Sequence, residues 1–280
     1  MHGWMEGQVC LLTDGVSAVG RQLAVCLAKM DATVVVVAKD ATQGAAARAE
    51  IVGRSGSTRV EVQVCDLSSR DDVTELATDF LCDHDRLDVL INNAELMPVA
   101  RVRTVDGWES CLAVNHLAPF LLTRLLLQQL PSSAPLRIVN VASGHHAQRL
   151  DLNDLNGVTA FHPARAYAAT RLMNVLFTYE LARRTEGTRI TVNCVQPRPT
   201  LPLVKARAIG PLYLATSALL EDVSGKYFVQ MKQARSADAS YDPALAVRLW
   251  NLSAQFVEQD ASPQSFPIPS PFVARSPAFS

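Results

Sequence analysis

Residues Gln8–Gly20 read QVCLLTDGVSAVG, an apolar run followed by a turn that contains Gly15 and Gly20. Apolar residues then recur at helical spacing over Val19–Met30. A strand, a glycine-containing turn and a helix in this order let backbone N–H groups and the helix dipole hold a phosphate group. Because only two glycines are present, this stretch by itself fits either a phosphate-binding turn or an ordinary strand–helix turn.

The same alternation continues along the chain. Thr33–Ala38 (TVVVVA) is a continuous β-branched run, which is typical of a strand buried on both faces. Four further runs have strand patterns: Val60–Cys65, Leu87–Ile91, Arg137–Val141 and Arg189–Val195. Helical patterns separate them, at Ala45–Val52, Asp71–Asp83, Trp108–Leu130 and Arg165–Arg184. The alternation predicts an α/β fold with a doubly wound parallel sheet, a Rossmann fold, with helices on both faces.

We expect a single domain over residues 1–257, because no linker or repeat interrupts the pattern. From residue 258 to 280 the composition changes, and five prolines stand among serines and phenylalanines. This composition predicts a disordered or polyproline-like tail.

Composition restricts the class of protein. The chain is 49% hydrophobic and 19% charged, as in a well-buried globular protein, and its formal charge of −1 gives no reason to expect nucleic acid as a partner. The spacing of the six cysteines suits neither zinc nor a CxxC pair, so we expect no metal site, reduced thiols and a cytoplasmic location. Met1–Gly7 lacks signal-peptide features, and the most apolar helix candidate, Leu117–Leu130, is too short to span a membrane.

Polar residues follow several predicted strands, at the edge where ligands of doubly wound sheets bind. Lys39 ends the second strand, where a lysine would pair with the 2′-phosphate of NADP; the alternative is a solvated surface lysine. Asp66 and Leu67 follow the third strand, and Asn93 and Ala94 follow the fourth.

Five stretches carry a family resemblance: DVLINNA (Asp88–Ala94), VNHLAPFLLT (Val114–Thr123), RIVNVAS (Arg137–Ser143), YAATRLMNVLFTYELARR (Tyr167–Arg184) and SGKYF (Ser224–Phe228). Over about Gly7–Phe256 the chain resembles the short-chain dehydrogenase/reductase family, most of all its retinol dehydrogenase-like subgroup. The resemblance implies hydride transfer between NADP(H) and a small lipophilic carbonyl or alcohol, such as a retinoid, a steroid or an aldehyde. It also implies a homodimer through the helices at Trp108–Leu130 and Arg165–Arg184.

The resemblance implies four catalytic roles. Ser143 polarises the substrate carbonyl, Tyr167 donates or accepts the proton, Arg171 stands at the position of the family's lysine, and Asn115 supports a water relay. A cation four residues after Tyr167 shares its helix face and stabilises the phenolate. The residues expected against the cofactor are Thr13, Gly15, Val19, Gly20, Lys39, Asp66, Leu67, Asn93, Ala94, Tyr167, Arg171, Pro197 and Thr200.

Several residues depart from the family pattern. Arg171 replaces a lysine, and arginine is a poor substitute in a proton relay because it does not release a proton. Asp14 and Ala18 stand at glycine positions of the first turn, and Glu95 replaces the glycine after Asn-Asn-Ala. Arg198 replaces the glycine that follows Pro197 in the family pattern. A carboxylate close to a phosphate would weaken cofactor binding through charge repulsion.

A shortened segment adds to these departures. Between Thr200 and Gly225 the chain has few residues for the substrate lid that the family usually places there. His145 and His146, close after Ser143, are interpreted as loop residues rather than metal ligands. Three hypotheses follow: an NADP(H)-dependent oxidoreductase, a catalytically impaired relative that acts as a binding or interaction protein, and a structural scaffold without a ligand.

Overall fold

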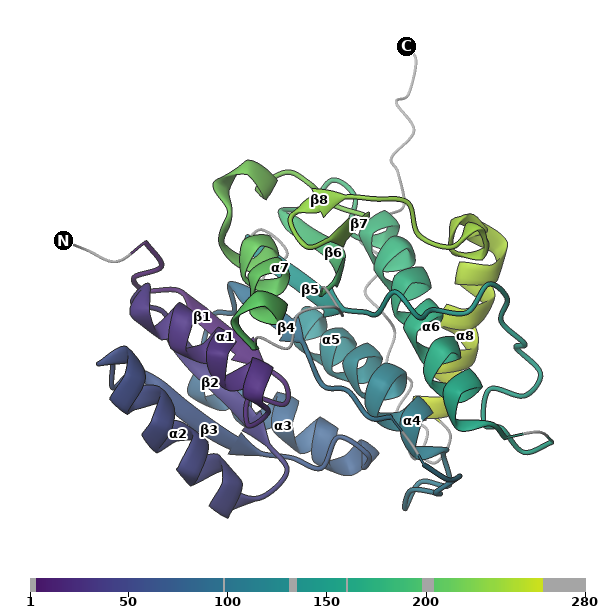
Figure 1. Cartoon of the computed structure of the whole chain (residues 1–280), viewed down its shortest axis with the longest axis horizontal. Coiled ribbons are helices and arrows are strands. Elements are labelled where there is room, and N and C mark those ends of the chain that lie inside the picture. Colours follow the sequence, from purple (N-terminus) through teal and green to yellow (C-terminus); the bar gives the residue numbers. More distant parts are fainter. Residues whose placement is uncertain (1–3, 98, 131–134, 160, 198–203, 259–280) are drawn as a thin grey trace, which may run out of the picture.

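The computed structural model describes residues 4–97, 99–130, 135–159, 161–197 and 204–258, which form one sheet with helices on both faces (Figure 1). The strand order among these residues is β3-β2-β1-β4-β5-β6-β7-β8. The strands are β1 (Val9–Leu12), β2 (Thr33–Ala38), β3 (Val60–Val64), β4 (Val89–Asn92), β5 (Leu136–Val141), β6 (Ile190–Gln196), β7 (Lys226–Val229) and β8 (Lys232–Gln233). All neighbouring pairs are parallel except β7 and β8. The predicted doubly wound sheet is confirmed.

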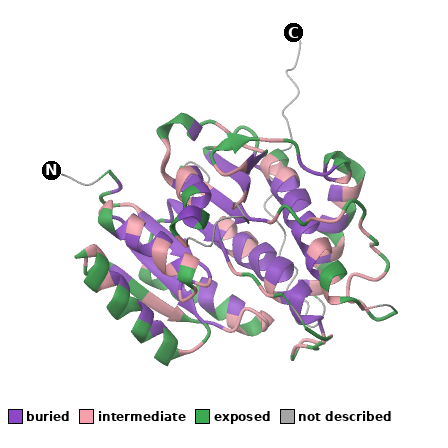
Figure 2. Ribbon diagram, in the orientation of Figure 1, coloured by how far each residue is buried: buried purple, intermediate pink, exposed green. Residues whose placement is uncertain are grey.

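The helices divide between the two faces, and the sheet between them is the most deeply buried layer (Figure 2). One face carries α1 (Ala18–Lys29), α2 (Ala41–Ser55) and α7 (Val204–Thr216). The other carries α3 (Arg70–Asp83), α4 (Ser110–Leu112), the π-helix η1 (Ala113–Leu117), α5 (Ala118–Gln129), α6 (Pro163–Arg184) and α8 (Pro243–Glu258). Two short 3-10 turns, η2 (Ala218–Leu220) and η3 (Asp238–Tyr241), complete the described helices.

The valine run of β2 shows why the sheet has two cores. Successive side chains of a strand point to opposite faces. Val35 and Val37 therefore pack in the core beneath α3 and α5, whereas Val34 and Val36 pack in the core beneath α1. All four valines are at most 2% exposed, so this strand is buried on both sides as its sequence predicts.

The helix predicted over Trp108–Leu130 differs in detail from the structure. It begins at Ser110 and contains the π-helical turn η1 between α4 and α5. The resulting segment, Ser110–Gln129, is long and apolar enough to span a membrane, so the argument from a short Leu117–Leu130 helix was wrong. However, 72% of its apolar window is buried inside the structure, as in the core helix of a globular domain.

The region after β6 was predicted least well. None of α7, β7, β8 and α8 was anticipated as an element, although each is well formed. Helix α8 runs through Glu258, the first residue of the predicted tail, and residues 259–280 of that tail lie outside the described residues.

Helix α8 covers the pair of long helices that the resemblance assigns to a homodimer. Trp250 of α8 packs against both Phe120 of α5 and Phe177 of α6, with its ring centroid 4.9 and 6.0 Å from theirs. The guanidinium of Arg184 lies 4.2 Å from the centre of the Trp250 ring. Helix α8 therefore packs on both helices that the resemblance assigns to a homodimer, and the homodimer itself stays a prediction.

Candidate active site

Thr13 joins the carboxyl ends of β1 and β4. Its hydroxyl oxygen accepts hydrogen bonds from the backbone N–H groups of Asn93 (2.9 Å) and Ala94 (3.1 Å). The Asn93 side chain donates in return to the Thr13 carbonyl at 3.2 Å. The sequence predicted these three residues at one site, and the structure brings them into direct contact.

The two glycines of the first turn are required by close packing. A Cβ on Gly15 would lie 2.5 Å from the Cβ of Val36, and a Cβ on Gly20 would lie 2.1 Å from the carbonyl oxygen of Asp14. Ser17 caps α1 by accepting a hydrogen bond from the Gly20 N–H at 3.1 Å. The turn therefore has the tight strand-to-helix geometry that a phosphate cradle needs. Val19, predicted at the cofactor, packs half-buried against the α1 side of the core.

Asp14 occupies the glycine position of this turn in a glycine-like conformation. Its φ of 53° lies in the left-handed region, which aspartate tolerates better than most residues. Burial raises the pKa of the Asp14 carboxyl, and the nearby negative charge of Glu95 raises it further. The two carboxylates predicted to oppose a phosphate therefore lie close enough to affect each other.

Lys39 and Asp66 form an ion pair, with 2.9 Å between Nζ and Oδ2. The lysine side chain is 70% exposed, so it is free to exchange this partner for another anion. Burial opposes ionisation of Asp66, but hydrogen bonds from Lys39 and Ser68 outweigh it and lower the pKa of the Asp66 carboxyl. Leu67, the next predicted residue, is half-buried and lines a small cavity beside Thr13.

Tyr167 meets two predicted and one unpredicted partner. Its hydroxyl donates a hydrogen bond to Oε1 of Glu95, and the side chain of Ser143, which follows β5, is near enough to affect the pKa of the phenol. Burial and the charge of Glu95 raise the pKa of the Tyr167 phenol, while Arg171 and Ser143 act in the opposite direction. The phenol is therefore held in its protonated form.

Arg171 lies beneath the tyrosine ring. Its side chain is 1% exposed, its Cζ lies 5.0 Å from the centre of the Tyr167 ring, and its Nη1 donates to the Val141 carbonyl at 3.1 Å. Its Nε and Nη2 have no hydrogen-bond partner among the described residues. Two buried donors without an acceptor are costly, so they favour a ligand or a water molecule with oxygen atoms.

Asn115 supports the site from the π-helical turn η1. Its Oδ1 accepts from the Leu96 N–H at 2.7 Å, and its Nδ2 donates to the Leu96 carbonyl at 2.9 Å and to Thr170 Oγ1 at 3.1 Å. The amide thus fixes the loop that carries Glu95 against α6. π-Helical turns often occur at functional sites, and this one turns Asn115 toward that loop.

Two contributors were not foreseen from the sequence. Arg207 of α7 lies 3.6 Å from Oε2 of Glu95, measured from its Nη2. The Nε2 of His146 accepts from the Ala237 N–H at 2.9 Å, so its Nδ1 carries the proton that is donated to the Ser143 carbonyl at 3.0 Å. The ring of His146 therefore fixes the loop that holds Ser143, a role that the loop interpretation did not include.

The segment after β6 is only partly described. Pro197 is half-buried directly after β6, whereas Thr200 and Arg198 lie outside the described residues. Residues 197–203 separate β6 from α7, and α7 occupies part of the Thr200–Gly225 segment that is predicted to be a shortened lid.

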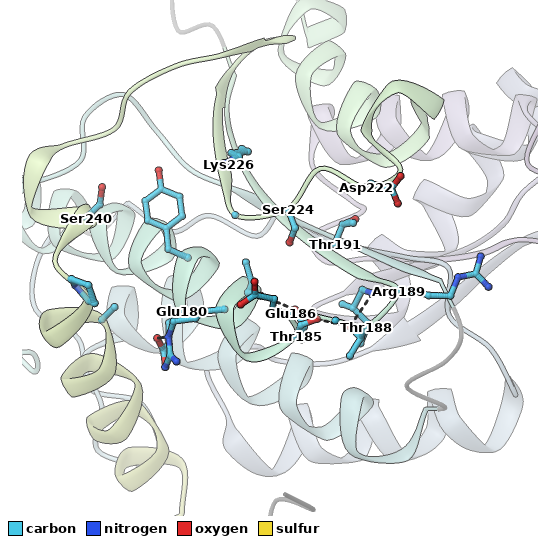
Figure 3. Close-up of a pocket in the computed structure, with 18 of the residues that line it drawn as sticks. Glu180, Thr185, Glu186, Thr188, Arg189, Thr191, Asp222, Ser224, Lys226 and Ser240 are labelled. Carbon is cyan, nitrogen blue, oxygen red and sulfur yellow. Dashed lines mark hydrogen bonds and ion pairs between the residues drawn. The ribbon is translucent and has the colours of Figure 1, made fainter. Parts of the chain in front are cut away.

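A large groove lies elsewhere, at the opposite edge of the sheet (Figure 3). It has a volume of about 830 Å³ and is lined by the loop before β6 and the start of β7, with Glu186, Arg189 and Lys226 among its residues. The predicted site residues lie at the carboxyl ends of the strands instead. We therefore do not assign this groove to the reaction.

Residues 8–208 match the family model of the short chain dehydrogenases. The chain belongs to this family. Retinol dehydrogenase 12 of Bos taurus is 35% identical over 273 residues, covering 90% of this chain and 86% of that protein. Retinol dehydrogenase 13 of Homo sapiens is also 35% identical, and the match covers 95% of this chain and 89% of that protein. A solved structure of an uncharacterised protein from Mycobacterium paratuberculosis is 30% identical with a TM-score of 0.80, covering 91% and 94%.

Family membership places the chain among oxidoreductases that transfer hydride with a nicotinamide cofactor. Its residues fit such a cofactor in shape, because Gly15 and Gly20 form the tight turn and Arg171 has two buried donors without a partner in the described part of the chain. The charges of Asp14 and Glu95 oppose it, although the half-buried position of Asp14 favours its neutral form.

Proposed function

We propose that this protein is an NADP(H)-dependent oxidoreductase that acts on a lipophilic carbonyl or alcohol and favours carbonyl reduction. The observation that carries the proposal is the meeting of Tyr167, Ser143 and the buried Arg171 at the edge where Thr13 ties β1 to β4. The nicotinamide supplies the hydride when it is bound.

The residues of the chain supply the proton and the orientation. The Ser143 hydroxyl orients the carbonyl oxygen, and Tyr167 donates its proton to that oxygen. The positive charge of Arg171, 5.0 Å from the ring centre, then stabilises the phenolate. Tyr167 is protonated at neutral pH and can therefore donate to a carbonyl oxygen, whereas burial and the charge of Glu95, which raise the pKa of its phenol, make it a weaker acid.

Two features support the choice of cofactor and substrate. Lys39 is exposed at the end of β2, and its ion pair with Asp66 is accessible to solvent. The 2′-phosphate of NADP can therefore replace Asp66 as the partner of Lys39. Met97 and Val99, close after Glu95 in the chain, are 63% and 95% exposed. Exposed apolar side chains that follow Glu95 so closely in the chain favour a lipophilic substrate, in keeping with the names of the retinol dehydrogenase relatives.

The second candidate function is a cofactor-binding protein with little or no turnover. It is favoured by the contact of the Tyr167 hydroxyl with Glu95 and by the hydrogen bond that turns Arg171 toward Val141. The six free cysteines support the proposal of a reducing, cytoplasmic location for either function.

Cofactor titration followed by turnover separates these functions. We expect protein fluorescence to report NADPH binding that is tighter than NADH binding, and we expect NADPH oxidation with a panel of retinals and other aldehydes. Binding without oxidation would establish the binding protein. An absence of NADPH binding would contradict both.

A further inference from the structure

Glu95 connects three segments at the mouth of the site. Through Oε1 its carboxylate accepts the hydrogen bond of Tyr167 in α6, and through Oε2 it pairs with Arg207 in α7 at 3.6 Å. Glu95 itself follows β4, in the loop that Asn115 fixes through Leu96. Tyr167 and Glu95 are 72 residues apart in the chain, so the fold alone brings them together.

We propose that Glu95 is a positioning residue that withholds the proton of Tyr167: its carboxylate holds the phenol through one oxygen and α7 through the other, and a carbonyl substrate receives the proton only when this contact opens. The assignment of Tyr167 as the proton donor rests on the proposed function. We refer to Glu95, Tyr167 and Arg207 below as the Glu95 latch.

In the Glu95 latch, the Glu95 carboxylate and the substrate carbonyl compete for the same hydroxyl proton of Tyr167. The Tyr167 hydroxyl has one hydrogen to donate, and it donates it to Glu95. A hydrogen bond to a carboxylate is about twice as strong as one to a neutral acceptor, so a carbonyl oxygen competes poorly while Glu95 is charged and in place. The charge of Glu95 also raises the pKa of the phenol, after burial the largest contribution, and this opposes formation of the phenolate.

The latch is built to open. The side chains of Arg207 and Glu95 are 46% and 35% exposed, so water and salt screen their ion pair. Exposed ion pairs contribute little to stability. A bound phosphate is a competing partner for the arginine, and release of Arg207 frees the carboxylate to leave the tyrosine.

Asp14 offers a matched control for Glu95. Both are carboxylates at the same edge, and each influences the other electrostatically. Of these two carboxylates, Glu95 is the one that hydrogen-bonds the Tyr167 hydroxyl and pairs with Arg207. Removing the charge of Asp14 therefore changes the electrostatics of the phosphate turn and leaves the latch in place.

The direct test is an ultraviolet titration of the Tyr167 phenol in the full chain without cofactor, with Tyr167→Phe subtracted as the blank. Glu95→Gln keeps an acceptor oxygen of the same length and removes the charge, so the phenol pKa should fall. Asp14→Asn should leave it close to that of the unmodified chain. An unchanged phenol pKa in Glu95→Gln, or an equal fall in Asp14→Asn, would overturn the proposal.

Hydrogen–deuterium exchange tests the ion pair between Glu95 and Arg207 of α7. In Arg207→Gln the backbone amides at the start of α7 should exchange faster, by up to about fivefold for an exposed ion pair. Lys205→Gln removes the same charge from the same helix and should leave exchange unchanged. Equal rates in Arg207→Gln and the unmodified chain would show that α7 is not held. Neither readout needs NADPH or turnover, so a failure to bind NADPH would count against the proposed function and not against the latch.

Discussion

At position 171 a planar guanidinium takes the place of the family's lysine and keeps its positive charge. Arg171 is 1% exposed and spends one N–H group on the Val141 carbonyl. The family resemblance implied that it would stand in for the lysine, and residues four apart share a helix face, so its charge can act on Tyr167. That two of its donors would remain buried without a partner could not be predicted, because it depends on packing around Tyr167.

Arg171→Lys should raise carbonyl reduction at least tenfold, which needs only about 1.4 kcal/mol of barrier. A lysine has a slimmer stem and three rotatable donors, so it can reach a ribose oxygen that the planar guanidinium misplaces. Steady-state kinetics with NADPH and an aldehyde measure the change. NADPH affinity should be measured in parallel, and no gain in turnover with NADPH bound would contradict the assigned role.

Lys39→Ala should weaken NADPH binding by about tenfold or more and leave NADH binding nearly unchanged. A charge-assisted hydrogen bond to the 2′-phosphate is worth about 1.5–3 kcal/mol, and NADH has no such phosphate. Isothermal titration with both cofactors measures the two affinities. Asp66 loses its ion-pair partner in this variant, so an equal loss for both cofactors would show that Lys39 acts through Asp66.

At the scale of elements, the local sequence was enough to predict β2 but not the π-helical turn η1. Thr33–Ala38 was predicted with its observed bounds because a continuous β-branched run has few alternatives. The break at η1 has no simple signal, although Pro119 in the first turn of α5 marks a helix start. Helix α8 had a signal that was not used: the buried residues Ala246, Leu249, Trp250, Ser253 and Val257 recur at helical spacing.

The contact between η1 and α8 predicts an acid sensitivity of the fold. His116 is fully buried, and its Nε2 lies 2.7 Å from the Ser253 hydroxyl, which donates to the Leu249 carbonyl. Burial lowers the pKa of His116 to about 4 from the ordinary 6.5. The unfolded chain therefore binds a proton between these pH values that the folded chain does not bind.

The free energy of unfolding should consequently fall by about 3 kcal/mol as the pH drops from about 6.5 to about 4 through this histidine, and it is unaffected by His116 at higher pH. Urea titrations at a series of pH values measure this slope. His116→Gln can keep the hydrogen bond to Ser253 but does not titrate, so its slope should be smaller over the same range. Equal slopes would place the acid sensitivity elsewhere.

At the scale of the whole molecule, the sequence established the doubly wound sheet and the edge that carries the site. The residues that meet there follow β1, β4 and β5 or lie on α6, as parallel strands require. Partners from the last third of the chain, such as Arg207 and Ala237, could not be placed, because their elements were not predicted. The same region contains α8, which covers part of the α5 and α6 surface that was expected to be exposed for pairing.

The packing of α8 on α5 and α6 favours a monomer over the homodimer that the resemblance implies. Trp250 contributes aromatic contacts with Phe120 and Phe177 from the same chain, and these contacts cover part of the surface of both helices. Sedimentation velocity over a range of concentrations should give the mass of one chain. A concentration-independent dimer would contradict this, and Trp250→Ala would then show whether α8 lies at its interface.

The central claim is that Tyr167 donates a proton while a nicotinamide delivers hydride to the same carbonyl. The most direct test is to incubate the protein with NADPH deuterated at the transferred position and a lipophilic aldehyde, and to measure deuterium in the alcohol by mass spectrometry. The account predicts deuterated alcohol from the unmodified chain and almost none from Tyr167→Phe, although both bind NADPH. Equal deuterium transfer by the two proteins, or none by the unmodified chain with NADPH bound, would contradict it.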